Sequence, residues 1–190
     1  MTTAPSEGER LDPVEPLQQA ERHGGARAWL NALDLSAYRA IRSLARDERH
    51  VAIVRRFSAL GEHGSLWLVL GGAGFALDGR RRARWKRAGL TVGGAYLTST
   101  SIKVAIGRQR PVVEGLPQLM ATPTGLSFPS SHSSSSFAAA QAYSRLVPAG
   151  VLYGIAVPMA MSRLFLGVHY PSDILAGAAL GTVLGRLGRG

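Results

Sequence analysis

Residues 162–173 read SRLFLGVHYPSD and place an arginine, a histidine and an aspartate in one short connection between two apolar segments. Pro171 has its φ fixed near the helical value and lacks an N–H, so it suits the first turn of a helix that would also contain Asp173. His169 would then stand just before a helix N-terminus. There Asp173 can accept a hydrogen bond from one imidazole nitrogen and leave the other nitrogen free as a nucleophile. The helix N-terminus and Arg163 both favour an anion at this place, whereas a packed or capping histidine is the more frequent alternative in such a turn.

The segments around this stretch predict an all-α fold. Apolar runs at helical length alternate with short polar breaks, and no long internal repeat is visible. A stretch rich in proline and glycine, residues 107–128, is expected to be irregular. The expected helices after residue 60 cover residues 66–77, 88–106, 134–147, 150–166 and 171–187.

The last of these helices carries a glycine on every fourth residue, at Gly177, Gly181 and Gly185. Such spacing puts a smooth stripe on one helix face and lets a neighbouring helix approach closely, as in membrane bundles. The serine run at residues 133–136 is interpreted either as low complexity or as the capping region of a helix.

The clustering of apolar residues in the second half favours an integral membrane helical bundle of about five to six helices. Residues 26–60 are apolar at helical spacing but carry too many charges to span, so an amphipathic helix or helix pair in the interface is expected; a solvated helix on a soluble core is the alternative. Residues 1–25 are interpreted as a disordered tail without a signal peptide. The chain of 190 residues is thus expected to form a single domain over residues 26–190, with membrane helices from about residue 62.

A formal net charge of +10 indicates an anionic partner: nucleic acid, anionic lipid headgroups or a phosphorylated substrate. The basic run at residues 80–87 can be a nucleic-acid patch, but between membrane helices it is more simply a cytoplasmic loop that obeys the positive-inside rule. The absence of cysteine excludes disulfides and thiolate metal sites.

Two cations, Lys103 and Arg110, stand two helical turns apart, so their charges would point the same way if the helix continues to Pro111. They suit a phosphate clamp, and snorkelling at a membrane edge is the alternative. A second histidine, His132, follows a Pro-Ser-Ser run at an expected helix start, which presents backbone N–H groups and hydroxyls.

Cleavage of a phosphate ester needs a nucleophile on one side of phosphorus and, on the other, an acid that protonates the leaving oxygen. His169 and His132 supply such a pair, and if the helices alternate up and down, both fall on the same side of the bundle as the three cations. The remaining histidines have no comparable surroundings and are expected to be incidental: His23, His50 and His63.

In chain order these residues form Lys-x6-Arg-Pro at 103–111, Pro-Ser-x-His at 129–132 and Ser-Arg-x5-His-x3-Asp at 162–173. Through these three motifs the chain resembles the type 2 phosphatidic-acid phosphatase superfamily, which includes membrane lipid phosphatases, soluble bacterial acid phosphatases and vanadium haloperoxidases. The resemblance implies the helical core of the acid phosphatases and vanadium haloperoxidases.

The resemblance also implies roles for the site residues. His169 would become a phosphohistidine with Asp173 orienting it, and His132 would serve first as the acid for the leaving group and then as the base for water. The implied ligands of the phosphoryl oxygens are Lys103, Arg110, Ser130, the backbone N–H of Ser131, and Arg163. Neither a metal nor another cofactor is implied. Ser131 stands where the family often has glycine, so its turn has to avoid positive φ.

Within the family, the apolar and glycine-striped helices favour the branch that acts on membrane lipids. The expected partners are therefore a lipid phosphate and the bilayer, and not nucleic acid. Candidate substrates are phosphatidic acid, phosphatidylglycerol phosphate, a polyprenyl pyrophosphate and decaprenylphosphoryl phosphoribose, and the Arg/Ala/Gly-rich composition leans towards a polyprenyl lipid. A basic loop at 80–87 in the cytoplasm would put the pocket on the extracytoplasmic face. A non-enzymatic basic membrane protein that binds anionic lipid and a vanadate-dependent peroxidase are the alternatives.

Overall fold

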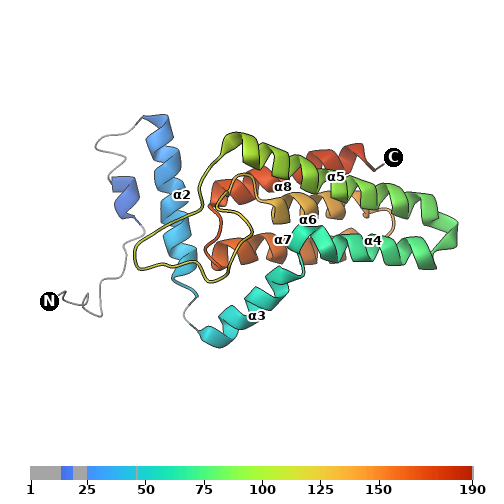
Figure 1. The fold of residues 1–190 in the computed structure, drawn as a ribbon, viewed down its shortest axis with the longest axis horizontal. Helices are drawn as coiled ribbons and strands as arrows, with labels where there is room; N and C mark the ends of the chain where they lie inside the picture. The colour runs from blue at the N-terminus through green and yellow to red at the C-terminus, as the bar shows by residue number, and fades with distance from the viewer. Residues whose placement is uncertain (1–13, 19–24, 46, 190) are drawn as a thin grey trace.

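The computed structural model describes residues 14–18, 25–45 and 47–189. This part of the chain is helical apart from its loops, and its one β-bridge is an isolated antiparallel pair between Gln109 and Leu126 (Figure 1). Most of the expected disordered tail, residues 1–25, lies outside the described residues. The helices are α2 (Ala26–Arg42), α3 (Glu48–Ala59), α4 (Ser65–Leu77), α5 (Arg82–Ile106), α6 (Ser131–Ala142), α7 (Ala149–Phe165) and α8 (Pro171–Leu187), with 3-10 turns η1 (Glu62–Gly64) and η2 (Gly79–Arg81).

Helix α6 is the centre of the bundle, because almost all of its side chains are buried between α5, α7 and α8 (Figure 1). Its serine run lies inside the helix rather than at its cap. Ser134 and Ser135 donate their hydroxyls to the carbonyls of Ser130 and Ser131, one turn earlier, at 3.0 and 2.9 Å. Small side chains that satisfy their own hydroxyls in this way allow a neighbouring backbone to come close.

The glycine stripe of α8 packs against this helix, as its spacing predicts. A Cβ built on Gly177 would lie 2.5 Å from the carbonyl oxygen of Ser130, and one on Gly185 would lie 2.7 Å from that of Ala138. A Cβ on Gly181 would meet the carbonyl oxygen of Ser134 more closely still. The backbones of α6 and α8 are therefore in direct contact along the stripe, and no larger residue fits there without moving a helix.

Aromatic side chains fill the bundle between α4, the first half of α5 and the C-terminal end of α6. Trp67, Trp85 and Tyr143 are buried together with small residues of α5 to α7. Each polar group of these rings has a partner: the Trp67 indole donates to Ser136 Oγ at 2.9 Å, the Trp85 indole to Asp78 at 3.1 Å, and the Tyr143 hydroxyl to the Trp67 carbonyl at 2.9 Å. This core leaves the opposite ends of α5 to α7 free to form a polar site.

Several expected boundaries are wrong, each for a local reason. Helix α5 begins at Arg82, so much of the basic run is helical rather than a loop, and Asp78 accepts the N–H of Arg81 just before it. The same helix ends at Ile106, because Gly107 adopts a left-handed φ of 69°. It does not continue to Pro111 as the spacing of Lys103 and Arg110 suggests. Helix α6 starts at Ser131 and is shorter than expected at its C-terminal end.

The segment over residues 26–60 forms two helices, α2 and α3, which pack on the ends of α7 and α8 (Figure 1). Helix α2 stands across one end of the bundle, where Tyr38 is fully buried and donates to the carbonyl of Gly167. Arg42 beside it donates to the carbonyls of Phe165 and Pro117. These bonds attach α2 to the two loops that carry site residues.

Within the described residues, no helix combines the length and the apolar character that crossing a membrane requires.

Candidate active site

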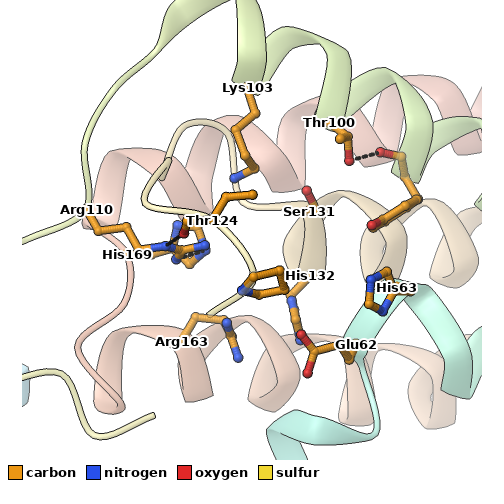
Figure 2. A pocket seen from close by; sticks show the side chains of 12 residues that line it. Glu62, His63, Thr100, Lys103, Arg110, Thr124, Ser131, His132, Arg163 and His169 are labelled. Carbon is orange, nitrogen blue, oxygen red and sulfur yellow. Dashed lines mark hydrogen bonds between the residues drawn. The ribbon is translucent and has the colours of Figure 1, made fainter. Parts of the chain in front are cut away.

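One pocket gathers the residues of all three sequence motifs (Figure 2). It lies where α5 ends and α6 begins, beside the last turn of α7 and the loop before α8. The alternation of the helices predicts this convergence, and the structure confirms it. The lining residues are Glu62, His63, Tyr96, Thr100, Lys103, Arg110, Pro123, Thr124, Ser131, His132, Arg163 and His169.

His169 is buried and has a defined tautomer. Its Nδ1 lies 3.4 Å from Oδ2 of Asp173, which is a carboxylate in the first turn of α8 and has no exposed surface. Its Nε2 lies 3.2 Å from Nη1 of Arg110, and since a guanidinium only donates, Nε2 carries the lone pair. Burial lowers the pKa of His169 well below its usual range, and the nearby charges of Arg110, Arg163 and Lys103 lower it further. The ring is therefore neutral, and its Nε2 lone pair faces the pocket, where it accepts from Arg110.

Lys103 and Arg110 reach the pocket from different elements. Lys103 is in the last turn of α5 and donates to the carbonyls of Ser127 and Pro129 at 2.9 and 2.8 Å. Arg110 lies in the irregular segment beyond Gly107 and donates to the carbonyls of Thr124 and Val168 at 2.8 and 2.6 Å. Both cations are thus held by backbone oxygens, without a carboxylate to neutralise them in these contacts.

Arg163 and His132 share a partner in α3. The Nη1 of Arg163 donates to the hydroxyl of Ser58 at 2.7 Å, and the Nε2 of His132 lies 3.2 Å from the carbonyl of the same residue. That carbonyl can only accept, so Nε2 of His132 carries a proton. The buried Nε of Arg163 has no hydrogen-bond partner in the described part of the chain. The segment expected to lie in the interface therefore supplies a residue that positions two side chains of the pocket.

The two serines of the second motif occupy different positions. Ser131 lines the pocket as the first residue of α6, and it does not have positive φ. Ser130 is fully buried behind it as the N-cap, where its hydroxyl accepts from the N–H of Ser133 at 3.4 Å and its own N–H donates to the carbonyl of Asp173. The latter bond joins the start of α6 to the start of α8, and with them the two histidines.

Sequence reasoning missed the residues that hold Asp173. Arg108 donates to Oδ1 of Asp173 and to Oδ2 of Asp34, both at 2.8 Å, and its guanidinium lies 4.2 Å from the ring centre of Tyr170. Asp34 in turn accepts the N–H of Ser172 at 2.8 Å. Oδ1 of Asp173 is thus occupied by Arg108, and Oδ2 accepts the N–H of Tyr170 at 2.8 Å and faces His169. Arg108 could have been suspected from its place two residues before Arg110 in the chain. The position of Asp34 depends on how α2 packs on the bundle, which no local pattern indicates.

Comparison with known proteins identifies the family. A family model described as the PAP2 superfamily matches residues 84–189, which include every motif described above. The chain belongs to the PAP2 superfamily. The relatives are named phosphatases, and the phosphatases of this family work without a metal ion, so the chain is an enzyme of this type and the alternative of a non-enzymatic basic membrane protein is wrong.

Other PAP2 proteins resemble the chain over most of their length. A decaprenylphosphoryl-5-phosphoribose phosphatase of Mycobacterium tuberculosis is 39% identical over 72% of this chain and 77% of its own. The crystal structure of Aquifex aeolicus LpxE matches with a TM-score of 0.71 and 25% identity over 82% of this chain and 94% of that one. A transmembrane PAP2-type phosphatidylglycerolphosphate phosphatase from Bacillus subtilis matches with a TM-score of 0.64 and 26% identity over 93% and 94% of the two chains.

The PAP2 pocket also contains residues that carry no family motif. His63, which is expected to be incidental, lines the pocket together with Glu62, both from η1. Tyr96 and Thr100 join them from one face of α5. His50 is exposed on α3 near Asp47, away from the pocket, and His23 lies outside the described residues. No pattern around residue 62 pointed to the pocket; only the packing of η1 on α5 and α6 brings it there.

Proposed function

We propose that the chain hydrolyses the terminal phosphate of a membrane lipid through a phosphohistidine on His169. The observation that carries this proposal is the placement of the His169 ring: Nδ1 faces Asp173, and Nε2 faces a pocket that holds Lys103, Arg110 and Arg163. A neutral nucleophile among three cations suits attack on a dianionic phosphate.

In the first step, Nε2 of His169 forms a bond to phosphorus as the bond from phosphorus to the leaving oxygen breaks. The leaving oxygen takes a proton from His132 on the opposite side; His132 enters this step as the imidazolium and leaves it as the neutral imidazole. In the second step His132 takes a proton from water, the resulting hydroxide attacks phosphorus, and the bond between phosphorus and nitrogen breaks to release inorganic phosphate. The charge on the phosphoryl oxygens is neutralised by Lys103, Arg110 and Arg163, with the backbone N–H of Ser131 as a further donor.

Arg110 and Ser130 take part in the reaction in different ways. Arg110 contacts Nε2 of His169, so it has to turn towards the phosphoryl oxygens when substrate binds. Ser130 acts through the cap of α6, which positions His132, rather than by touching phosphate. Both assignments are part of the proposal.

A lipid substrate is supported by the names of the relatives, which are phosphatases of a polyprenyl phosphosugar and of phosphatidylglycerol phosphate. We propose a polyprenyl-linked or phosphatidic-acid-type lipid for this chain as well. The mycobacterial relative, at 39% identity, favours the polyprenyl-linked class.

We further propose that the bundle is embedded in the cell membrane as a multi-pass protein. Large apolar side chains are exposed on several of its helices: Leu77 is 87% exposed, Leu90 67% and Leu175 70%. Such exposure is unfavourable in water and suits contact with lipid. The basic residues of η2 and early α5 and the C-terminus lie at the end of the bundle away from α2 and the pocket (Figure 1). With those charges in the cytoplasm, the pocket opens on the extracytoplasmic face.

Phosphate release in detergent micelles tests the enzymatic proposal. Purified wild type is assayed in EDTA on phosphatidic acid, phosphatidylglycerol phosphate and a polyprenyl pyrophosphate, beside His169→Ala and the matched control His50→Ala. We expect His169→Ala to lose at least about 10⁴-fold in kcat, as removal of a covalent nucleophile does, and to keep its thermal stability. The control should keep wild-type activity.

Full activity of His169→Ala would refute the nucleophile assignment. Oxidation of bromide in the presence of vanadate would favour the peroxidase alternative, whereas inhibition by vanadate with no halide oxidation would support the phosphatase. Release of the protein from membranes by an alkaline wash would contradict the proposed embedding.

A further inference from the structure

The pocket extends beyond the residues that the proposed phosphoryl transfer uses. Glu62, His63, Tyr96 and Thr100 line it, yet none of them belongs to the three motifs. Figure 2 shows Lys103, Arg110 and His169 on one side of His132, and Glu62 and His63 on the other. Arg163 lies below His132 between these two groups, so the pocket has a cationic side and, opposite it, a side with Glu62 and His63.

The second side adjoins the proposed acid of the reaction. Gly61, immediately before η1, lies so close to His132 that a Cβ there would be 2.9 Å from Cδ2 of the ring. A group leaving in line from His169 passes His132 as it takes up a proton, because attack and departure occur on opposite faces of phosphorus. The leaving group thus occupies the space next to Glu62 and His63.

Glu62 is half-buried in this space, and its carboxylate forms no ion pair with a described residue. In the part of the chain that the structure describes, no cation lies within 4 Å of its carboxylate, although its charge acts on Arg110 and Arg163 from farther away. A carboxylate only accepts hydrogen bonds, so it suits a partner that donates, such as a hydroxyl. It repels a second phosphate group placed in the same space.

The neighbours of Glu62 fit the same kind of partner. His63 is held in the left-handed region at a φ of 54°, an uncommon conformation for a residue other than glycine, and its ring lies 5.7 Å from that of Tyr96. Thr100 donates its hydroxyl to the Tyr96 carbonyl at 2.9 Å, which leaves the oxygen free to accept. Together they offer hydrogen-bond acceptors beside two ring faces, and no lysine or arginine.

We infer that this side of the pocket binds the leaving group of the substrate, and that it selects a phosphomonoester of a hydroxylated group, such as a sugar or polyol headgroup, over a pyrophosphate. The inference rests on the proposed function, because it takes His169 as the attacking side and His132 as the leaving side. Hydroxyls of the headgroup donate to Glu62, and a sugar ring packs against His63 and Tyr96. A pyrophosphate places its second phosphate against Glu62 instead of a cation.

The test compares Glu62→Gln with wild type on three lipids in mixed micelles. Phosphatidylglycerol phosphate has a free hydroxyl on its leaving group, phosphatidic acid has none, and a polyprenyl pyrophosphate carries the second phosphate. Glu114→Gln is the matched control, since it makes the same charge change on an exposed side chain outside the pocket.

We expect wild type to have its highest kcat/KM on phosphatidylglycerol phosphate and its lowest on the pyrophosphate. In Glu62→Gln, kcat/KM on phosphatidylglycerol phosphate should fall about tenfold, because one charge-assisted hydrogen bond is lost. On the pyrophosphate kcat/KM should rise about tenfold, because one charge repulsion is removed. The control should match wild type on all three lipids.

A uniform change on all three lipids would overturn the inference, because Glu62 would then only balance the cations of the pocket. A wild type that prefers the pyrophosphate would overturn it as well. Absence of phosphate release from every lipid by wild type would instead refute the proposed function.

Discussion

The substitution Gly177→Ala tests whether the close contact between α6 and α8 is required for stability and activity. A Cβ at this position would lie 2.5 Å from the carbonyl oxygen of Ser130 and 3.0 Å from Cβ of Ser133. Ordinary contacts of this kind are about 3.5 Å long, so the two helices have to separate by about 1 Å locally. Both contacts are with the first turn of α6 or its cap, which cannot rotate away as a flexible side chain can.

The cost follows from overpacking. Forcing extra carbon into a close-packed contact costs about 1–3 kcal/mol, against a gain of about 0.5–1 kcal/mol from replacing glycine by alanine in a helix. Gly94→Ala in α5 is the matched control, since a Cβ there meets nothing within 4 Å and should give the gain alone. Because both variants share that gain, we expect them to differ by the overpacking cost, about 1–3 kcal/mol, or about 2–12 °C in Tm for a chain of this size.

Activity should fall together with stability. Gly177 is one turn after Asp173, and Ser130 is two residues before His132, so separation of the helices also separates the two histidines. A displacement of about 1 Å costs about a hundredfold in rate when it disturbs the alignment of reacting groups. Thermal unfolding in detergent and kcat on phosphatidic acid measure the two effects. If Gly177→Ala unfolds at the same temperature as Gly94→Ala and keeps wild-type kcat, the close contact of α6 and α8 is not required.

Two further predictions concern the surroundings of His169. Replacing Arg108 by Gln removes charge-assisted hydrogen bonds to Asp173 and Asp34, so kcat should fall about tenfold to a hundredfold with KM unchanged. Arg108→Lys should restore part of the lost kcat. An unchanged kcat in Arg108→Gln would contradict this positioning role. Burial lowers the pKa of His169 in the folded protein. Below about pH 6.5 the unfolded chain therefore binds a proton at this residue and the folded chain does not, so the free energy of unfolding decreases as the pH falls. His169→Gln should therefore lose less Tm than wild type between pH 7 and pH 5, and equal losses would argue against a neutral buried imidazole.

Much of the fold and most of the site could be predicted because the signals are local in the chain. Pro171 begins α8 as its fixed φ predicts, and the glycine stripe packs against a neighbouring backbone as its spacing predicts. The three motifs predict which histidines and cations meet, since each stands at a helix end and the helices alternate in direction. The predicted end of α5 was wrong because two residues could have ended the helix. Gly107 ends it rather than Pro111, and Arg110 reaches the pocket from the loop that follows.

The amino-acid sequence by itself determined the all-helical class, the motif residues and the family, because helix periodicity, capping and motif spacing act over a few turns of chain. Tertiary structure alone decided which side chains support them. Asp34, Ser58 and Glu62 lie far from the motifs in the chain. Asp34 contacts Arg108, Ser58 contacts Arg163 and Glu62 lines the pocket only because α2, α3 and η1 pack on the ends of α5 to α8. That packing depends on how whole helix faces fit together, which no short pattern encodes.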